Sequence, residues 1–188
     1  MPKQLLKEID ERRAYRALSE EPIAADTLAR IMTAATYAPS CFNNQSWRFL
    51  VITEKEALLK VSEALTEANY WAKKAPAMVV VATKPGLDCQ LSEGRDYALF
   101  DCGLATQNLL LQSEKEGVYA HPMAGFDPVV VKKAFDIPDD FIVITLVAMG
   151  QPGSDSHLIE KHLKAEKSPR TRNPESEVIS YNKWGFDG

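Results

Sequence analysis

The sequence predicts one globular domain in which helices cover a buried sheet. The chain has 188 residues, of which 45% are apolar and 26% are charged, as in globular domains and unlike disordered or fibrous chains. Residues 77–83 and 141–150 are apolar at almost every position, as expected for strands covered on both faces. The first half of residues 96–116 is apolar almost all round, which predicts a buried central helix. We therefore expect a single domain over residues 1–188.

Further elements are marked by hydrophobic spacing and by turn residues. One long helix is expected from Glu54 to Ala75, because its apolar residues share one side and Pro76 follows it. In chain order, the sequence predicts a short helix near residues 5–9, a helix between Asp26 and Pro39, a strand at 47–53, the helix at 54–75, a strand at 77–83, the helix at 96–116, a strand at 118–121, a helix capped by Asp127 and a strand at 141–150.

The last part of the chain, residues 151–188, is expected to form a C-terminal arm. It is polar and has too few apolar residues to fold alone. Apolar side chains nevertheless recur near its end, at Val178, Ile179, Tyr181, Trp184 and Phe186. This pattern predicts an arm that packs on its own domain or on a second copy of the chain.

The net charge and the cysteine count limit which binding partners and which cellular compartment are expected. A net charge of −4 and a pI near 5.5 argue against nucleic acid or anionic membranes as partners. The apolar stretches are shorter than the ~18 residues that span a bilayer, and residues 1–13 lack the apolar region of a signal peptide. Three cysteines, Cys41, Cys89 and Cys102, without a CxxC pair favour free thiols in a reducing compartment. We expect a cytoplasmic protein.

Several familiar sites are excluded by their missing motifs. The sequence has no GxGxxG, no GxxxxGK[ST] and no GxSxG, which argues against Rossmann, P-loop and hydrolase-elbow sites. His157 and His162 are five residues apart and have no cysteine pair beside them, so no metal site is expected. A nucleophile made of Cys41 and His121 remains an alternative, although a buried, inert thiol is the better interpretation.

Three features could carry chemistry. Arginines cluster at both ends of the chain, and a converging set would bind a phosphate dianion. Residues 38–49 offer amides suited to the edge of a heterocycle, and residues 122–127 contain a glycine that lets backbone amides approach a flat ligand. Each has an ordinary alternative: a solvated helix face, a helix-to-strand connection and a tight turn.

The order of these motifs is more specific than any one of them. RRAYR near residue 12 is followed by APSxxNxQxW near residue 40 and by DCGLATQNLLL near residue 105. MAGFD and an RxRxP tail that ends in YNKWG complete the set. Over Arg12 to Trp184, this ordered set resembles the FMN-dependent nitroreductase family of flavoproteins.

The resemblance implies an α+β fold of three α/β/α layers, with a mostly antiparallel central sheet, in an intertwined homodimer. It implies FMN at the dimer interface, NADH or NADPH as reductant, and a small-molecule electron acceptor such as a nitroaromatic or a quinone, reduced in a ping-pong cycle. No catalytic side chain is then required, because the flavin carries the chemistry. The alternatives are dehalogenation, ene reduction or flavin breakdown on the same scaffold, a non-catalytic FMN-binding protein, and a cofactor-free thiol hydrolase using Cys41.

The resemblance also assigns residues to the flavin. Arg16 would lie near N1 and O2 of the ring and tune its potential, and Asn69 would read the pyrimidine edge. The other implied contacts are Arg12, Arg13, Arg170 and Arg172 with the phosphate, Pro39, Ser40, Cys41 and Asn43 from the other subunit with the ring system, and Met123, Ala124 and Gly125 with the ring and its N5 and O4. Two departures from the family pattern are Ala14, which lacks a hydroxyl for the phosphate, and Ser46, which is expected to affect loop stiffness alone.

Overall fold

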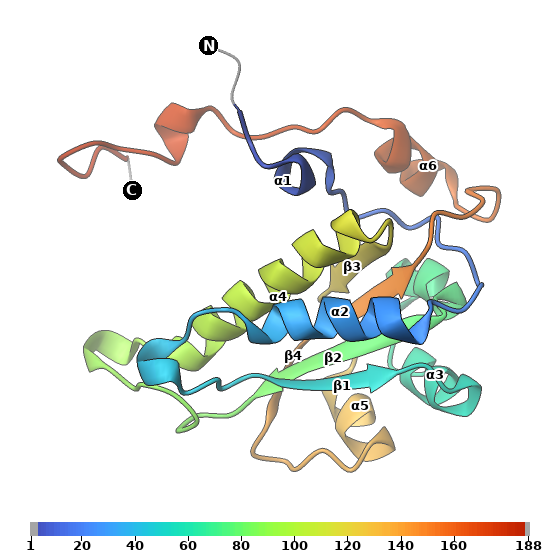
Figure 1. Ribbon diagram of the computed structural model, residues 1–188, viewed down its shortest axis with the longest axis horizontal. Helices are drawn as coiled ribbons and strands as arrows, with labels where there is room; N and C mark the ends of the chain where they lie inside the picture. The colour runs from blue at the N-terminus through green and yellow to red at the C-terminus, as the bar shows by residue number, and fades with distance from the viewer. Residues whose placement is uncertain (1–3, 187–188) are drawn as a thin grey trace.

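The sheet has four antiparallel strands in the order β1-β2-β4-β3 in the computed structural model, which describes residues 4–186 (Figure 1). The strands are β1 (Arg48–Ile52), β2 (Ala77–Thr83), β3 (Tyr119–Met123) and β4 (Ile142–Gly150). All seven residues of β2 are buried, because β2 is central and covered on both faces. The two apolar stretches in the sequence therefore correctly predicted the two central strands.

Helices cover both faces of this sheet, so the predicted three-layer α/β/α arrangement is confirmed (Figure 1). Because side chains alternate along a strand, Val79 and Val81 of β2 pack with one helical layer and Met78 and Val80 with the other. The first layer consists of α2 (Ala25–Thr36) and α4 (Tyr97–Lys115), and the second of α3 (Lys55–Ser62), η2 (Glu67–Lys74) and α5 (Pro128–Ala134).

The expected long helix at 54–75 is wrong, because the segment breaks into α3 and η2. At the break the chain pairs with the loop after β3 instead of continuing its own helical hydrogen bonds. The Thr66 amide donates to the Gly125 carbonyl at 3.1 Å, and the Asp127 amide donates to the Ala64 carbonyl at 2.8 Å. Side-chain periodicity alone did not reveal this competing backbone partner.

The two ends of the chain lie together above α4 in Figure 1. The N-terminal end forms α1 (Lys7–Glu11), and the C-terminal end forms α6 (Glu160–Lys167) and η4 (Glu175–Glu177). Residues 151–168 pack on the domain, where Leu158 is buried and the Ile159 amide donates to the Tyr70 hydroxyl at 2.8 Å. Beyond η4, Tyr181 and Trp184 are more than 80% exposed. Among the described residues, no helix combines the length and apolar character needed to span a bilayer.

Candidate functional site

The arginines from the two ends of the chain converge. Arg170 donates through Nη1 to the Ile9 carbonyl at 2.7 Å and through Nη2 to the Arg12 carbonyl. Arg13 donates through Nη2 to the Ser168 carbonyl at 2.7 Å. We refer to Arg12, Arg13, Arg170 and Arg172 as the arginine cluster. Arg12 and Arg13 lie in extended chain after α1, so the alternative of a solvated helix face is wrong.

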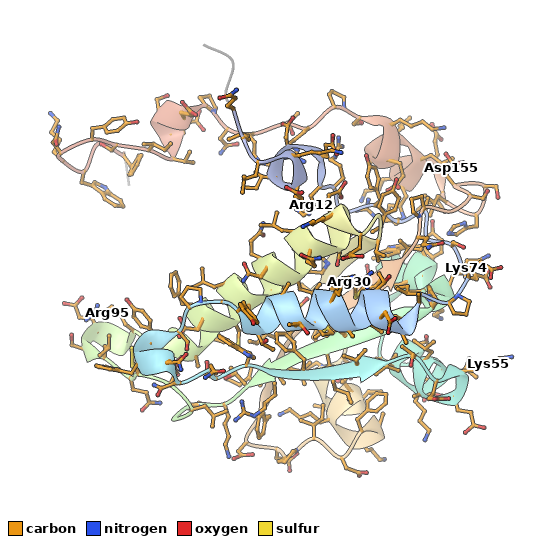
Figure 2. All side chains as sticks on the ribbon, viewed as in Figure 1. Arg12, Arg30, Lys55, Lys74, Arg95 and Asp155 are labelled. Atoms are coloured by element: carbon orange, nitrogen blue, oxygen red, sulfur yellow. A yellow bond between two sulfur atoms is a disulfide. The ribbon has the colours of Figure 1, made fainter. Side chains whose placement is uncertain are left out.

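The arginine cluster concentrates positive charge. Burial, together with the neighbouring charges of Arg170 and Arg172, lowers the pKa of Arg12, and Glu114 at the end of α4 opposes this effect. The pKa of Glu114 is raised, chiefly by its own burial. Figure 2 shows Arg12 between α1 and the C-terminal end of α4. A bound anion would relieve the repulsion among these guanidinium groups.

Arg16 has a carboxylate partner. Its Nη1 lies 3.4 Å from Glu166 Oε1, and the two side chains are 23% and 8% exposed. Glu166 also accepts hydrogen bonds from the backbone amide of Arg16, at 3.1 Å to each oxygen. The Arg16 guanidinium lies 5.9 Å from the centre of the Trp71 ring. Arg16 is therefore not an exposed helix charge, and its direction is fixed from two sides.

Two pairs of aromatic rings lie close to Arg16. The rings of Trp71 and His121 are 4.5 Å apart, and those of Tyr15 and Tyr119 are 4.3 Å apart. Burial lowers the pKa of His121 to about 4, and its Nδ1 lies 3.1 Å from the Tyr15 carbonyl. His121 is therefore neutral near pH 7 and has a packing role that the sequence did not indicate.

The loop after β3 is fastened to η2. The Gly125 carbonyl accepts hydrogen bonds from Asn69 Nδ2 at 2.9 Å and from Thr66 Oγ1 at 3.0 Å. A Cβ at Gly125 would lie 2.7 Å from Thr66 Oγ1, so a larger residue there would displace the Thr66 or Asn69 side chain. Ala124 is exposed, whereas the Met123 side chain is 3% exposed and packs in the core. The contact of Met123 with the ring stays a prediction, and the burial of its side chain leaves the backbone of Met123 for such a contact.

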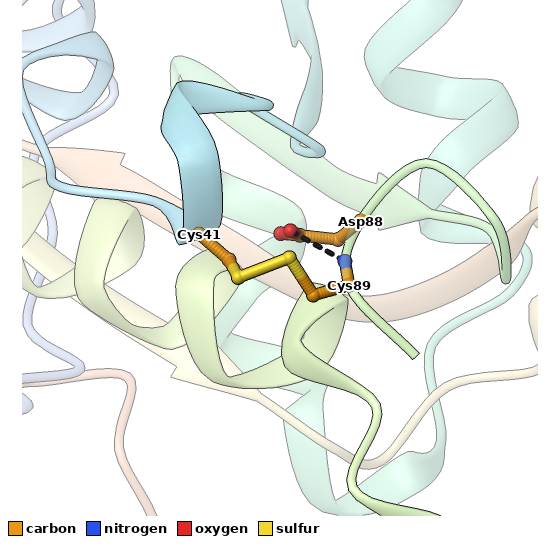
Figure 3. Close-up of side chains that lie close together, drawn as sticks. All are labelled: Cys41, Asp88 and Cys89. Atoms are coloured by element: carbon orange, nitrogen blue, oxygen red, sulfur yellow. Dashed lines mark hydrogen bonds between the residues drawn. A yellow bond between two sulfur atoms is a disulfide. The ribbon is translucent and has the colours of Figure 1, made fainter. Parts of the chain in front are cut away.

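The expected free thiols at Cys41 and Cys89 are wrong, because the two residues form a disulfide across 48 positions of sequence (Figure 3). Cys41 begins the short helix η1 (Cys41–Asn43), and Cys89 precedes η3 (Ser92–Gly94). Cysteine pairing cannot be deduced from spacing alone. The disulfide removes the cysteine argument for a reducing compartment and leaves no thiolate at Cys41 for the hydrolase alternative. Cys102 is the free cysteine.

Two buried carboxyl groups, Asp88 and Asp101, lie next to the disulfide. The Cys41 amide donates to Asp101 Oδ2 at 2.8 Å. The Cys89 amide donates to Asp88 Oδ1 at 2.7 Å (Figure 3). Burial and a hydrogen bond with Asp88 raise the pKa of Asp101. Burial also acts to raise the pKa of Asp88, but hydrogen bonds from Asp101, the Cys89 amide and other donors outweigh it and lower that pKa. Of the two carboxyl groups, Asp101 therefore binds a proton more readily than Asp88 does.

Ser46 belongs to this buried group, so the expectation that it affects loop stiffness alone is wrong. Its Oγ donates to Asp88 Oδ2 at 2.9 Å, and Ser46 is fully buried. Asp88 and Asp101 were not predicted, although an acidic residue at position 101, in the apolar first half of a helix, is a signal that could have revealed them. Cys41, Asp88 and Cys89 place possible metal ligand atoms within 4.8 Å of one another. Both sulfurs are covalently paired in this form and offer no thiolate for a metal.

Within one chain, the arginine cluster and the loop at residues 39–46 lie at opposite ends of α4. Cys41 contacts Asp101 in the second turn of α4, whereas Arg12 is influenced by Glu114 in its last turn. These two α4 positions are 114 − 101 = 13 residues apart, which corresponds to about 20 Å along the helix. Pro39 and Asn43 are exposed, and Ser40 Oγ accepts from the Gln45 amide at 3.0 Å. One chain therefore does not bring all the predicted residues together.

Comparison with known proteins identifies the family. Residues 9–83 and 65–151 match the Nitroreductase family. The chain belongs to this family. A protein of Archaeoglobus fulgidus, provisionally named NADH dehydrogenase/NAD(P)H nitroreductase, is 32% identical over 82% of this chain and 89% of its own length. An NADH dehydrogenase of Thermus thermophilus is 25% identical over 78% of this chain and 85% of its own length. The prediction of a nitroreductase-type oxidoreductase is thus confirmed.

Solved structures agree with this assignment. A crystal structure described as an oxidoreductase containing FMN aligns with a TM-score of 0.84 and 29% identity, covering 100% of this chain and 96% of that chain. A nitroreductase family protein from Clostridium novyi aligns with a TM-score of 0.73 and 26% identity, covering 80% and 85%. The α+β nitroreductase fold predicted from the sequence is therefore confirmed.

Proposed function

We propose that the protein is an FMN-dependent oxidoreductase that uses NADH or NADPH to reduce small conjugated acceptors, with nitroaromatics and quinones as the substrate class. The observation that carries this proposal is the convergence of Arg12, Arg170 and Arg172, because the proximity of these charges suits an anionic group. FMN brings such a group as its phosphate. The solved oxidoreductase that contains FMN aligns with the full length of this chain, which supports the same cofactor.

The members of the arginine cluster would have different roles at the phosphate. Arg170 and Arg13 each donate to a backbone carbonyl near the other end of the chain, so they hold the C-terminal arm against the N-terminal segment. Arg172 is exposed and donates through Nη1 to the neighbouring Thr171 carbonyl at 2.7 Å. A guanidinium has five N–H donors, so Arg172 retains capacity for phosphate oxygens. Arg12 supplies a half-buried charge at the centre of the cluster.

Bound FMN would supply the hydride and electron transfer, and the chain would orient it and tune its potential. Arg16 is directed by Glu166 and Trp71, so its charge is held in one place. A fixed cation near the ring would favour a reduced, more negative flavin. The backbone of residues 123–125, with Asn69 fastened to it, would form a rigid edge beside the ring. His121 is neutral near pH 7 and therefore adds no positive charge to this region.

We also propose that the working unit is a cytoplasmic homodimer, with the domain over residues 1–188 and the arm from residue 151 reaching the partner. The separation of about 20 Å along α4 means that Pro39, Ser40, Cys41 and Asn43 would come from the other copy. The exposed apolar side chains after η4, such as Trp184 at 82%, favour a second surface that covers them. Sedimentation of the FMN-loaded protein should give a dimer, and a stable monomer of about 20.9 kDa with full occupancy would contradict this proposal.

Substitution of Arg172 tests the phosphate site. We expect Arg172→Ala to weaken FMN binding by about ten- to a hundredfold, since one charge-assisted hydrogen bond contributes roughly 1.5 to 3 kcal/mol. Riboflavin lacks the phosphate, so its affinity should be the same for the variant and the wild type. Lys55→Ala is the matched control, because it removes one exposed positive charge on α3, outside the arginine cluster (Figure 2). An equal loss for riboflavin would contradict a phosphate role.

Enzymatic turnover is tested separately. The FMN-loaded protein should oxidise NADH or NADPH when a nitroaromatic or a quinone is supplied, and steady-state kinetics should give the parallel lines of a ping-pong cycle. A protein that binds FMN but oxidises neither nucleotide would instead be a flavin-binding protein without this activity.

Redox titration tests the role of Arg16. If Arg16→Ala removes about 1 to 2 kcal/mol of preference for the reduced flavin, the midpoint potential falls by roughly 20 to 45 mV. Affinity for oxidised FMN should change much less than affinity for reduced FMN. A potential within a few millivolts of wild type would assign the tuning to backbone amides near Ala124.

A further inference from the structure

The Cys41–Cys89 disulfide closes a loop whose middle residues, 42–45, are exposed. We call residues 39–46, together with Cys89, the disulfide loop. Three residues of this loop that are not glycine have left-handed backbone angles: Phe42 at φ 48°, Asn43 at φ 58° and Gln45 at φ 50°. Such angles are costly for residues with a Cβ and persist where the surroundings impose them. Phe42 is 89% exposed, so core packing does not impose this conformation.

Besides the disulfide, hydrogen bonds of the Cys41 amide with Asp101 and of Ser46 with Asp88 hold the two ends of this segment, and the residues between them make fewer contacts. Asn44 Nδ2 donates to Asp88 Oδ1 at 3.1 Å, and the Gln45 amide donates to Ser40 Oγ at 3.0 Å within the segment itself. The disulfide is therefore the strongest constraint on residues 41–45. Its loss would leave the unfavourable backbone angles without the bond that fixes Cys41 against Cys89.

The cysteines are also positioned to re-form the bond after it opens. Their backbone amides are held by Asp101 and Asp88, two neighbouring buried carboxyl groups, and these hydrogen bonds do not depend on the sulfur–sulfur bond. Both cysteines are partly exposed in the single chain, so a reductant can reach the sulfurs before a partner and its FMN cover them. Cys102 is 1% exposed, and burial raises its pKa to about 11, so it stays a thiol and does not compete in exchange.

We propose that Cys41–Cys89 is a second redox site of this protein, opened by a dithiol reductant, and that its opening loosens residues 40–45. In the reaction, one thiolate of the dithiol attacks the sulfur of one cysteine, the bond between the two protein sulfurs breaks, and the other cysteine leaves as a thiolate that takes up a proton. The second thiol of the dithiol, as its thiolate, then attacks the dithiol sulfur of this mixed disulfide and releases the first cysteine, which is protonated in turn. The dithiol is oxidised to a disulfide, and the protein gains two electrons and two protons as the thiols of Cys41 and Cys89.

The consequence for the flavin rests on the proposed function, in which this segment lines the ring bound by the partner. A loosened segment must be ordered again when FMN binds, and this ordering costs affinity. The oxidised protein should therefore bind FMN more tightly than the reduced protein. The redox state of a dithiol pool would in this way set the flavin occupancy.

The test compares oxidised protein with protein incubated with dithiothreitol under native conditions. Alkylation should add two groups, on Cys41 and Cys89, after reduction and none before it, and re-oxidation should reverse the change. Hydrogen exchange of amides in residues 40–46 should become faster after reduction, while that of β2 stays unchanged. FMN titration should give at least about tenfold weaker binding, because the loop is ordered on binding.

Two variants keep the test specific. Cys89→Ser lies outside residues 40–46 and should show the fast exchange and weak FMN binding without any reductant. Cys102→Ser keeps the disulfide and should respond to dithiothreitol as the wild type does. Resistance of the native disulfide to dithiothreitol, or equal exchange and equal FMN affinity in both redox states, would overturn the inference. If exchange responds while neither state binds FMN, the redox site stands and the proposed flavin function fails.

Discussion

The arginine cluster and the disulfide loop are held in place by opposite means. The cluster joins the two ends of the chain by hydrogen bonds from guanidinium groups to carbonyls, such as Arg170 to Ile9 at 2.7 Å. The disulfide loop is held by a covalent bond, and the backbone amides of the two cysteines donate to two buried carboxyl groups. The first region should respond to the charge of its surroundings and the second to their redox potential. One protein therefore carries two regions with separate chemical sensitivities.

Loss of the disulfide should have the largest effect on stability. The bond closes a segment with a sequence separation of 48, and the chain-entropy relation gives about 4 kcal/mol for a loop of this size. We expect Cys89→Ser to lower the free energy of unfolding by up to about this amount in urea denaturation under oxidising conditions. With dithiothreitol present, the wild type should lose the same stability. A variant as stable as oxidised wild type would show that the carboxyl pair alone holds the loop.

Acid should act at His121, next to the arginine cluster, because burial and the charges of Arg16 and Arg12 lower the pKa of this histidine. Its pKa is about 4 in the folded chain, below the ~6.5 of an unfolded histidine. Between these values the unfolded chain binds a proton that the folded chain does not, so stability rises with pH from about 4 to 6.5, by up to about 3 kcal/mol. The urea midpoint should fall less on acidification for His121→Asn than for wild type. Equal slopes would mean that His121 titrates normally.

A smaller effect should reveal how closely the loop beside the proposed ring site is packed. A Cβ at Gly125 would lie 2.7 Å from Thr66 Oγ1 and 2.9 Å from Asn69 Nδ2. We expect Gly125→Ala to cost about 1 to 3 kcal/mol through overpacking. Gly103→Ala in α4 is the control, because its Cβ would meet no atom within 4 Å, and alanine should gain up to about 1 kcal/mol there. Thermal unfolding that ranks the two variants in the opposite order would contradict this packing.

The sequence predicted the sheet and the central helix well, because their signals are local. Residues 77–83 form β2 as expected, and the helix expected at 96–116 is α4, with Gly117 in the left-handed conformation after its end. The break between α3 and η2 was not predicted, because it depends on hydrogen bonds to Gly125 and Asp127 some 60 residues away in sequence. Local hydrophobic spacing contains no information about such a partner.

The candidate site was predicted unevenly for a similar reason. The meeting of Arg12 with Arg170 was anticipated through the resemblance to the nitroreductase family, which implies that both arginines contact one phosphate. The disulfide and the buried pair of Asp88 and Asp101 were missed, because each depends on which residues the fold brings together. Glu166, the partner of Arg16, was missed because a lone acid in a polar helix looks like surface charge.

The position of β4 has a consequence for synthesis on the ribosome. β4 comes last of the strands in the chain, yet it lies between β2 and β3 and pairs with both. Until residue 150 has been translated and has left the exit tunnel, β3 has no neighbour and β2 has one open edge. Unpaired edges of apolar strands promote aggregation. The nascent sheet is therefore open to aggregation until β4 has emerged from the tunnel, and it can be completed only after that point.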